Sequence, residues 1–392
     1  HEMITQIKPV SLQLKQLPTA YKFTKEDMQT MQDPEDKVEH VSAIEAEDSD
    51  LDEYKLMEND TVILCCRSGD LGSVDVVVFN PQGDLFFRNS VQLPFLPLSV
   101  ETFAFTPLTT EAEGQFMAVT GFSTEIELYD LNVMDQVQPD FVIAQSKYFK
   151  NTAVPHQDAH HEAVLSCSWY QVHPNILATV GIDGLCKFWD FASLNLITGM
   201  KCHEGGCNNI QFVGEQQFYT TGIEDKKIKM WDFTKSTDAP VETIQLKRNI
   251  EQLFYQDGAF VVSTEDGWLI SAKNGEQTEI QVFDNQPITA LAVFKQLIVC
   301  GSPENTVIKG FIDGQQVFEQ DVGGRVFSCT FGVNTSQMMI FVGMDFNKLR
   351  ALNICKRLTK EQIVAVFGKE GLKVVDIVDQ DLNLEGEVDE NL

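Results

Sequence analysis

Short apolar segments alternate with polar turns along most of the chain. Residues 61–66, 74–79 and 85–91 are rich in Val, Ile, Leu and Phe, and turn sequences with Gly, Asp, Asn or Pro separate them. Segments of this length and composition favour β-strands over helices. Together with an earlier strand over residues 4–12, they predict one antiparallel sheet of four strands.

A set of four residue types recurs with a constant offset of 42 residues. The first set is His161, Thr179, Asp183 and Trp189, and the second is His203, Thr221, Asp225 and Trp231. A period of roughly 40–45 residues closed by a Trp-Asp dipeptide is typical of the WD repeat, in which each unit is a four-stranded blade of a β-propeller.

The spacing gives each member of the set a place in its blade. We expect the His before the first strand, the Thr on the second, the Asp in the turn that follows and the Trp on the third. These side chains can form one buried hydrogen-bonded chain, which we call a tetrad. A catalytic His-Asp pair is the alternative, but the pair recurs in both repeats and a Trp belongs to each set. The tetrads are therefore interpreted as structural.

The same rhythm continues on both sides of these two repeats, in weaker form. In the second blade Tyr129 replaces the Trp and Ser123 stands where the Asp is expected. Three further segments, near residues 260–267, 297–301 and 339–345, resemble the second strand and its turn. The sequence predicts an all-β, seven-bladed WD-repeat β-propeller over residues 3–375, with six or eight blades as alternatives. The last strand is expected within residues 356–367 or 372–378.

Charge is concentrated outside the predicted blades. The formal net charge is −29, with a pI near 4.5. Residues 26–60 hold 14 acidic residues against Lys37 and Lys55, which predicts a disordered insert within blade one. Residues 376–392 hold seven acidic residues and no basic one, which predicts a flexible tail. This charge disfavours nucleic-acid binding through a broad basic surface and favours basic proteins as partners.

The sequence holds little that indicates catalysis or a cofactor. It has no phosphate-binding glycine loop and no nucleophile-elbow motif. Cys202, His203 and Cys207 could suggest zinc, but no second ligand pair follows and the tetrad already uses His203. The nine cysteines show no paired framework, which favours a reducing compartment. Neither a signal peptide nor a long apolar run appears, so a membrane role is not expected.

The order of several segments resembles that of the periodic tryptophan protein 1 family of WD-repeat proteins. These segments are residues 60–67 (Asp-Thr-Val-Ile-Leu-Cys-Cys-Arg), 74–80, 96–101 (Leu-Pro-Leu-Ser-Val-Glu), 126–131, 137–139 and 161–169. The resemblance is best over residues 60–232. Blade two departs from the family pattern at Tyr129, and residues 135–159 contain only two lysines in place of a lysine cluster.

The resemblance implies a protein-interaction scaffold in large ribosomal subunit assembly and rRNA processing, acting in the nucleus and nucleolus and not as an enzyme. The expected partners are basic ribosomal proteins, assembly factors and pre-ribosomal particles. A histone-binding propeller on chromatin is one alternative. A substrate adaptor of a ubiquitin ligase or of a trafficking complex is another.

Overall fold

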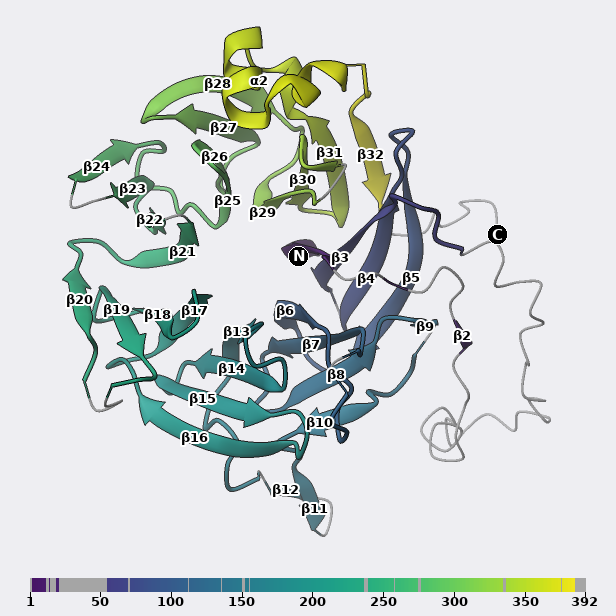
Figure 1. Ribbon diagram of the computed structural model, residues 1–392, viewed down its shortest axis with the longest axis vertical. Coiled ribbons are helices and arrows are strands. Elements are labelled where there is room, and N and C mark those ends of the chain that lie inside the picture. Colours follow the sequence, from purple (N-terminus) through teal and green to yellow (C-terminus); the bar gives the residue numbers. More distant parts are fainter. Residues whose placement is uncertain are drawn as a thin grey trace.

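The computed structural model describes residues 2–11, 14, 19–20, 55–69, 71–111, 113–134, 136–149, 152–154, 156–235, 239–256, 258–273, 276–333, 336–374 and 376–384. Within these residues, seven antiparallel four-stranded sheets surround a central axis like the blades of a propeller (Figure 1). The predicted all-β fold with seven blades is confirmed.

The first three blades follow the chain from the inner strand to the outer one. Blade one contains β1 (Met3–Pro9), β3 (Thr61–Ser68), β4 (Gly72–Phe79) and β5 (Leu85–Leu93). Blade two contains β6 (Pro97–Phe103), β7 (Phe116–Gly121), β8 (Ile126–Asp130) and β10 (Phe141–Ile143). Blade three contains β13 (Val164–Trp169), β14 (Ile176–Gly181), β15 (Leu185–Asp190) and β16 (Asn195–Lys201).

The other four blades repeat this order. Blade four contains β17 (Cys207–Val213), β18 (Gln217–Gly222), β19 (Lys227–Asp232) and β20 (Glu242–Gln245). Blade five contains β21 (Ile250–Gln256), β22 (Ala259–Thr264), β23 (Trp268–Lys273) and β24 (Glu276–Gln281). Blade six contains β25 (Ala290–Phe294), β26 (Leu297–Gly301), β27 (Val307–Ile312) and β28 (Gln315–Asp321). Blade seven contains β29 (Val326–Phe331), β30 (Met339–Met344), β31 (Lys348–Asn353) and β32 (Gln380–Asn383).

Several short strands and helices lie outside the seven four-stranded sheets. β2 (Thr19–Ala20) pairs in parallel with β9 (Val133–Met134), and β11 (Lys147–Phe149) forms a hairpin with β12 (Thr152–Val154). The long connection between β31 and β32 holds the 3-10 helices η3 (Ile354–Lys356) and η4 (Lys369–Lys373) and the helix α2 (Lys360–Phe367).

The predicted position of the last strand is wrong. Residues 360–367 form α2 because Thr359 and Gln362 make a capping box, in which each side chain accepts a hydrogen bond from the backbone N–H of the other. The outer strand of blade seven is β32, which pairs with β31. The propeller therefore extends past residue 375, and the predicted tail does not begin at 376. Residues 385–392 lie outside the described residues.

The acidic insert leaves the chain where the sequence predicted, between the first and second strands of blade one. β1 pairs directly with β3 in the sheet of blade one, so the insert lies between these two strands in the sequence. The buried side chain of Leu56 packs in the apolar cluster of β3 and β4. The predicted insert, 26–60, therefore ends before Leu56, and its residues 26–54 lie outside the described part of the chain.

The ring closes where β1 meets blade seven. The Ser328 hydroxyl donates a hydrogen bond to the Ile4 carbonyl at 3.0 Å, and the Phe346 N–H donates to the Glu2 carbonyl at 2.9 Å. A single β-bridge joins Met3 to Asp345. Each blade is thus made from its own consecutive strands, and blades seven and one meet side by side.

Amide side chains join neighbouring inner strands across the gaps between blades. The Val100 N–H donates to Gln6 Oε1 at 2.6 Å, which links β1 to β6. Gln211 exchanges two hydrogen bonds with the backbone of Tyr255, at 2.9 and 3.1 Å, which links β17 to β21. These amides satisfy inner-strand groups that an adjoining β-ladder would otherwise bond.

The main apolar clusters fill the space between blades. The Phe103 ring of blade two stacks on the Phe191 ring that follows β15, with 4.0 Å between ring centroids. Both rings belong to one cluster with the buried Trp189. Among the described residues, no helix combines the length and the apolar character needed to span a bilayer.

Candidate functional site

The propeller has two faces that differ in chemistry. The tetrad face carries the turns between the second and third strands of each blade, such as residues 182–184, and the links that precede each inner strand, such as residues 202–206. The channel face lies at the opposite end, where each inner strand leads into the second strand.

Blade three contains a complete tetrad on the first of these faces. The Trp189 indole N–H donates to Thr179 Oγ1 at 2.8 Å, and Thr179 Oγ1 lies 2.9 Å from Nε2 of His160. The other ring nitrogen, Nδ1, lies 3.0 Å from the Asp183 carboxylate. With Nδ1 protonated, the Trp donates to the Thr, the Thr donates to the His, and the His donates to the Asp carboxylate.

Blade four repeats the arrangement with the same atoms. The Trp231 indole N–H donates to Thr220 Oγ1 at 2.9 Å, which lies 2.8 Å from His203 Nε2. His203 Nδ1 lies 2.9 Å from the Asp225 carboxylate. The structure thus joins six of the eight predicted side chains into two tetrads, in which His160 and Thr220 replace the other two.

The prediction of His161 as a tetrad member is wrong, and His160 takes that place. His161 is exposed and contributes only its backbone N–H, which donates to Asp183 at 3.0 Å. The number of residues between the His and the start of the inner strand identifies the tetrad member. His160 precedes Val164 by four residues, and His203 likewise precedes Cys207 by four. The loop that joins the first two strands of blade three, between Trp169 and Ile176, is longer than the corresponding loop of blade four. A constant offset of 42 residues therefore selects His161, next to the true member.

The prediction of Thr221 is also wrong, and Thr220 is the tetrad member. Residues 222–227 form the turn in blade four, whereas residues 181–185 form the turn in blade three. Because the turn of blade four is one residue longer, its tetrad Thr lies one position farther from the Trp along the chain. Successive strand residues point to opposite faces, so Thr221 turns the other way and donates to Asn208 Oδ1 at 2.7 Å. An alignment on Gly181 and Gly222 would have found Thr220.

The electrostatics of the tetrads agree with a structural role. Burial lowers the pKa of His203 more than the Asp225 carboxylate raises it, so this imidazole is neutral near pH 7. Burial alone would raise the pKa of Asp183, but hydrogen bonds from His160 and from the His161 and Leu185 N–H groups outweigh burial and lower it. Both His-Asp pairs are held by fixed partners, which leaves them poorly placed to exchange protons with a substrate.

In other blades, different side chains occupy the positions that the tetrad occupies in blades three and four. In blade two the Tyr129 hydroxyl donates to the buried Glu127 carboxylate at 2.6 Å. In blade five Arg248 lies 3.6 Å from Asp266 and stacks on the Trp268 ring, and in blade seven Arg325 lies 2.9 Å from Asp345. These arginines were not predicted from the sequence, although a basic residue just before an inner strand could have indicated them.

The three potential zinc ligands lie together but are engaged elsewhere. The ligand atoms of Cys202, His203 and Cys207 lie within 4.8 Å of one another. Both ring nitrogens of His203 are taken by the tetrad, and the Cys202 thiol donates to the Gly184 carbonyl at 3.2 Å. Burial raises the pKa of Cys207 well above its ordinary value, which disfavours the thiolate that zinc requires. All nine cysteines lie in described segments, where each is buried as a free thiol.

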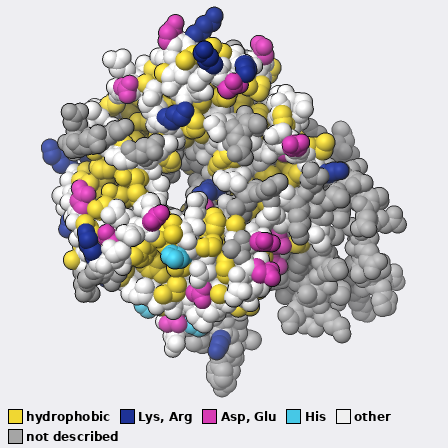
Figure 2. Space-filling model, viewed as in Figure 1, with side chains coloured by type: hydrophobic (Ala, Val, Ile, Leu, Met, Phe, Trp, Pro, Cys, Tyr) yellow, Lys and Arg dark blue, Asp and Glu magenta, His cyan; other side chains and the backbone are white. Residues whose placement is uncertain are grey.

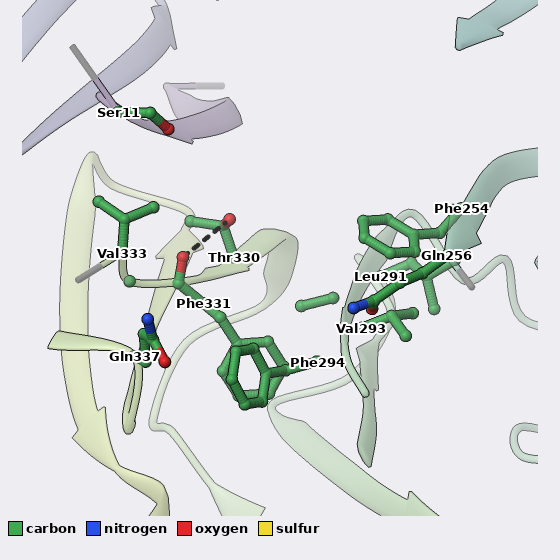
Figure 3. Close-up of a pocket in the computed structure, with 12 residues that line it drawn as sticks. Ser11, Phe254, Gln256, Leu291, Val293, Phe294, Thr330, Phe331, Val333 and Gln337 are labelled. Carbon is green, nitrogen blue, oxygen red and sulfur yellow. Dashed lines mark hydrogen bonds between the residues drawn. The ribbon is translucent and has the colours of Figure 1, made fainter. Parts of the chain in front are cut away.

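The channel face opens into cavities at the centre of the ring, and Figure 2 shows the central hollow with hydrophobic side chains around it. A cavity of about 710 Å³ is lined by the inner strands of blades one to five. A second cavity of about 440 Å³ lies beside blades five, six and seven (Figure 3). Its lining is largely apolar and includes Phe254, Leu291, Val293, Phe294 and Phe331.

The larger cavity carries one ion pair. Lys8 Nζ lies 2.9 Å from Glu101 Oε1, between the inner strands of blades one and two. Burial would lower the pKa of Lys8, but the Glu101 carboxylate raises it by more, so the amine stays charged. The sequence could not predict this pair, because the residues meet only when adjacent blades pack. The pair stabilises the ring and gives the cavity polar groups able to bind another protein.

A third hollow, of about 500 Å³, lies between blades three and four on the channel face. Its lining includes Tyr170, Phe188 and Phe233, and the Tyr170 ring stacks on that of Phe212 at 4.6 Å between centroids. Trp169 donates its indole N–H to the Pro174 carbonyl at 2.9 Å. The hollow between blades three and four is therefore mainly apolar, whereas the larger central cavity contains charged and polar side chains.

Comparisons with known proteins agree with this architecture. Residues 152–190 match the family model described as WD domain, G-beta repeat, which corresponds to blade three. The chain is similar in fold to the WD40 β-propeller domain of Doa1, with a TM-score of 0.57, 16% identity, and coverage of 74% of this chain and 88% of that one.

Two relatives extend the similarity beyond one blade. The chain is 26% identical to an uncharacterised WD repeat-containing protein of Schizosaccharomyces pombe, over 74% of this chain and 60% of that protein. It is 25% identical to the periodic tryptophan protein 1 homologue of Drosophila melanogaster, over 73% of this chain and 65% of that protein. The chain thus spans less than two thirds of the length of either relative. These matches indicate no enzymatic family. The chain is a divergent WD-repeat protein similar to periodic tryptophan protein 1.

Proposed function

We propose that this propeller is a protein-interaction scaffold in large ribosomal subunit assembly and rRNA processing, acting in the nucleolus. Similarity to the Drosophila periodic tryptophan protein 1 homologue over 73% of the chain carries this proposal. The resemblance of residues 60–232 to that family supports the same assignment. The scaffold would act by stoichiometric binding, with partners held on the faces of the ring.

Charge supports basic proteins as the partners. Residues 26–60 and 376–392 together hold 19 of the 29 net negative charges. Among the described residues on either side of the insert, Ala20 lies on β2, which pairs with β9, and Leu56 packs in the apolar cluster of β3 and β4. Acidic segments attract basic proteins over distances set by the ionic strength, so they would raise the rate of encounter more than the final affinity.

A density gradient of native extract tests the proposal. The tagged protein should sediment with precursors of the large subunit and their RNA at low salt, and raising the salt should release the fraction held by charge alone. A version without residues 26–54 is the matched control, because it keeps the buried Leu56. It should still sediment with the particles, in smaller amount. Sedimentation only as a light species, with chromatin or with a ligase complex would contradict the proposal.

A further inference from the structure

Five neighbouring blades present an apolar side chain on the tetrad face. Leu71, Phe122 and Phe346 are 65%, 60% and 62% exposed, and Ile182 is 38% exposed. Ile223 is partly buried in the corresponding turn of blade four. These residues belong to the turns of blades seven, one, two, three and four, which follow one another around the ring in Figure 1. We call them the apolar arc.

The arc is held in a fixed arrangement. Backbone hydrogen bonds of 2.9–3.1 Å fix four of its residues. Three of them bond to the link before the inner strand of their own blade, and Phe346 bonds to Glu2, before β1 of blade one; the pairs are Phe122 to Leu96, Ile182 to Ala163, Ile223 to Gly206 and Phe346 to Glu2. Phe346 keeps its exposed ring with a backbone φ of +55°, a conformation that costs free energy for a bulky residue. Large apolar groups fixed in solvent are typical of a surface prepared for binding.

Blades five and six carry carboxylates in the turns that correspond to those of the apolar arc. The turn of blade five contains Glu265 and Asp266, and the turn of blade six contains Glu304. Asp266 is occupied by Arg248. Glu251, the bulged residue at the start of β21, is partly buried, and burial together with the nearby Glu265 charge raises its pKa to about 7. Among the described residues, no lysine or arginine forms an ion pair with Glu251.

We propose that the tetrad face is a docking surface for a protein segment that carries both large apolar side chains and at least one Lys or Arg. The apolar groups would cover the arc, and the cation would lie beside Glu251 and Glu265. Charge complementarity selects this partner: a basic group relieves the repulsion between two neighbouring carboxylates, whereas an acidic segment increases it. A second copy of this chain would place acidic turns against each other. The inference deepens the proposed scaffold role by naming the face and the partner chemistry.

Selection from a phage-displayed library of random short peptides tests the surface directly, on the intact immobilised protein. The selected peptides should combine aromatic or aliphatic residues with Lys or Arg. Their affinity, measured by calorimetry with synthetic peptides, should fall by about tenfold or more when Phe122→Ser is combined with Phe346→Asn. Asn is chosen at position 346 because it tolerates the left-handed backbone.

Matched variants separate the two parts of the surface. Glu251→Gln with Glu265→Gln should weaken binding about two- to tenfold and reduce its salt dependence, since only the charge is removed. Val172→Ser with Ile197→Ser removes two exposed apolar residues, 47% and 51% exposed, from the channel face. That variant should bind the selected peptides like the parent.

The inference is overturned if the selected peptides are acidic, if their binding survives the arc variant, or if the channel-face variant abolishes it. Dimerisation that depends on Phe122 would also overturn it in favour of self-association. None of these outcomes depends on ribosomal particles. A protein that binds such peptides through the arc but sediments alone would refute the ribosomal role and leave the docking surface intact.

Discussion

At the residue scale, the tetrads show what a single amino acid contributes to a blade. Trp189 is 1% exposed and supplies both apolar area and the first donor of the hydrogen-bonded series. The residue types were readable from the sequence, because their spacing reflects strand and turn lengths. The members His160 and Thr220 were not, because the hairpins and turns differ in length between the two blades, so one fixed offset does not align every member.

Replacing Trp189 with Ala should destabilise the protein by roughly 3–5 kcal/mol, because a large buried aromatic side chain leaves a cavity. Urea denaturation followed by circular dichroism measures the change. A free energy of unfolding within about 0.5 kcal/mol of the parent would contradict the buried position of this ring.

The two adjacent histidines provide a test with an internal control. His160→Ala removes a buried imidazole that bonds Thr179 and Asp183, so it should cost roughly 1–3 kcal/mol or more. His161→Ala keeps the only hydrogen bond that His161 gives Asp183, through its backbone N–H, and should change stability by less than about 0.5 kcal/mol. Equal effects in thermal denaturation would refute the assignment of His160.

Glu251 makes stability depend on pH in a predictable direction. Its pKa is about 7 in the folded protein and near the ordinary 4.5 when unfolded. The folded state therefore binds more protons than the unfolded state between these values, so stability falls as the pH rises from about 4.5 to about 7 and levels off above that. Glu251→Gln should stabilise the protein by on the order of 1–2 kcal/mol at about pH 8, and by little at about pH 5. Melting curves at both pH values measure this, and a gain that is the same at both would exclude the explanation.

At the element scale, the buried strands and the outer strand β5 of blade one were predictable, but the outer strand of blade seven was not. Strands such as β14 and β30 are continuous apolar runs, buried on both sides, and these stand out in a sequence. The outer strand β32 reads Gln-Asp-Leu-Asn and is half exposed, so its sequence resembles an acidic tail. What fixes it is pairing with β31, supported by the ion pair of Arg350 with Asp381.

Two truncations distinguish strand from tail. Removing residues 385–392 should leave the melting temperature unchanged. Removing residues 380–392 takes away β32, exposes the edge of β31 and should cost roughly 1–3 kcal/mol. If both truncated proteins melt together with the parent, β32 contributes nothing to the blade.

At the scale of the whole molecule, most of the net negative charge lies in segments of the sequence outside the apolar clusters that hold the blades together. The apolar clusters lie between blades, whereas most of the negative charge lies in the insert and near the C-terminus. A seven-bladed ring was predictable because each blade repeats the same strand pattern. The channel ion pair and the apolar arc were not, since each depends on how separate blades face one another across the ring.

Deleting residues 26–54 should therefore alter association and spare the fold. Melting temperature should stay within a few degrees of the parent, and binding to a basic test protein such as lysozyme should weaken at low salt. Loss of cooperative unfolding on this deletion would show that the segment contributes to blade one.

The seam between blades seven and one also has a consequence for biosynthesis. Because every sheet uses consecutive strands, each blade can complete its own hydrogen bonds as soon as its four strands have left the ribosome. The bonds between blades seven and one, such as those from Ser328 and Phe346 to the N-terminal strand, must wait for the last blade. We therefore expect the ring to stay open between β1 and the most recently completed blade until blade seven has formed.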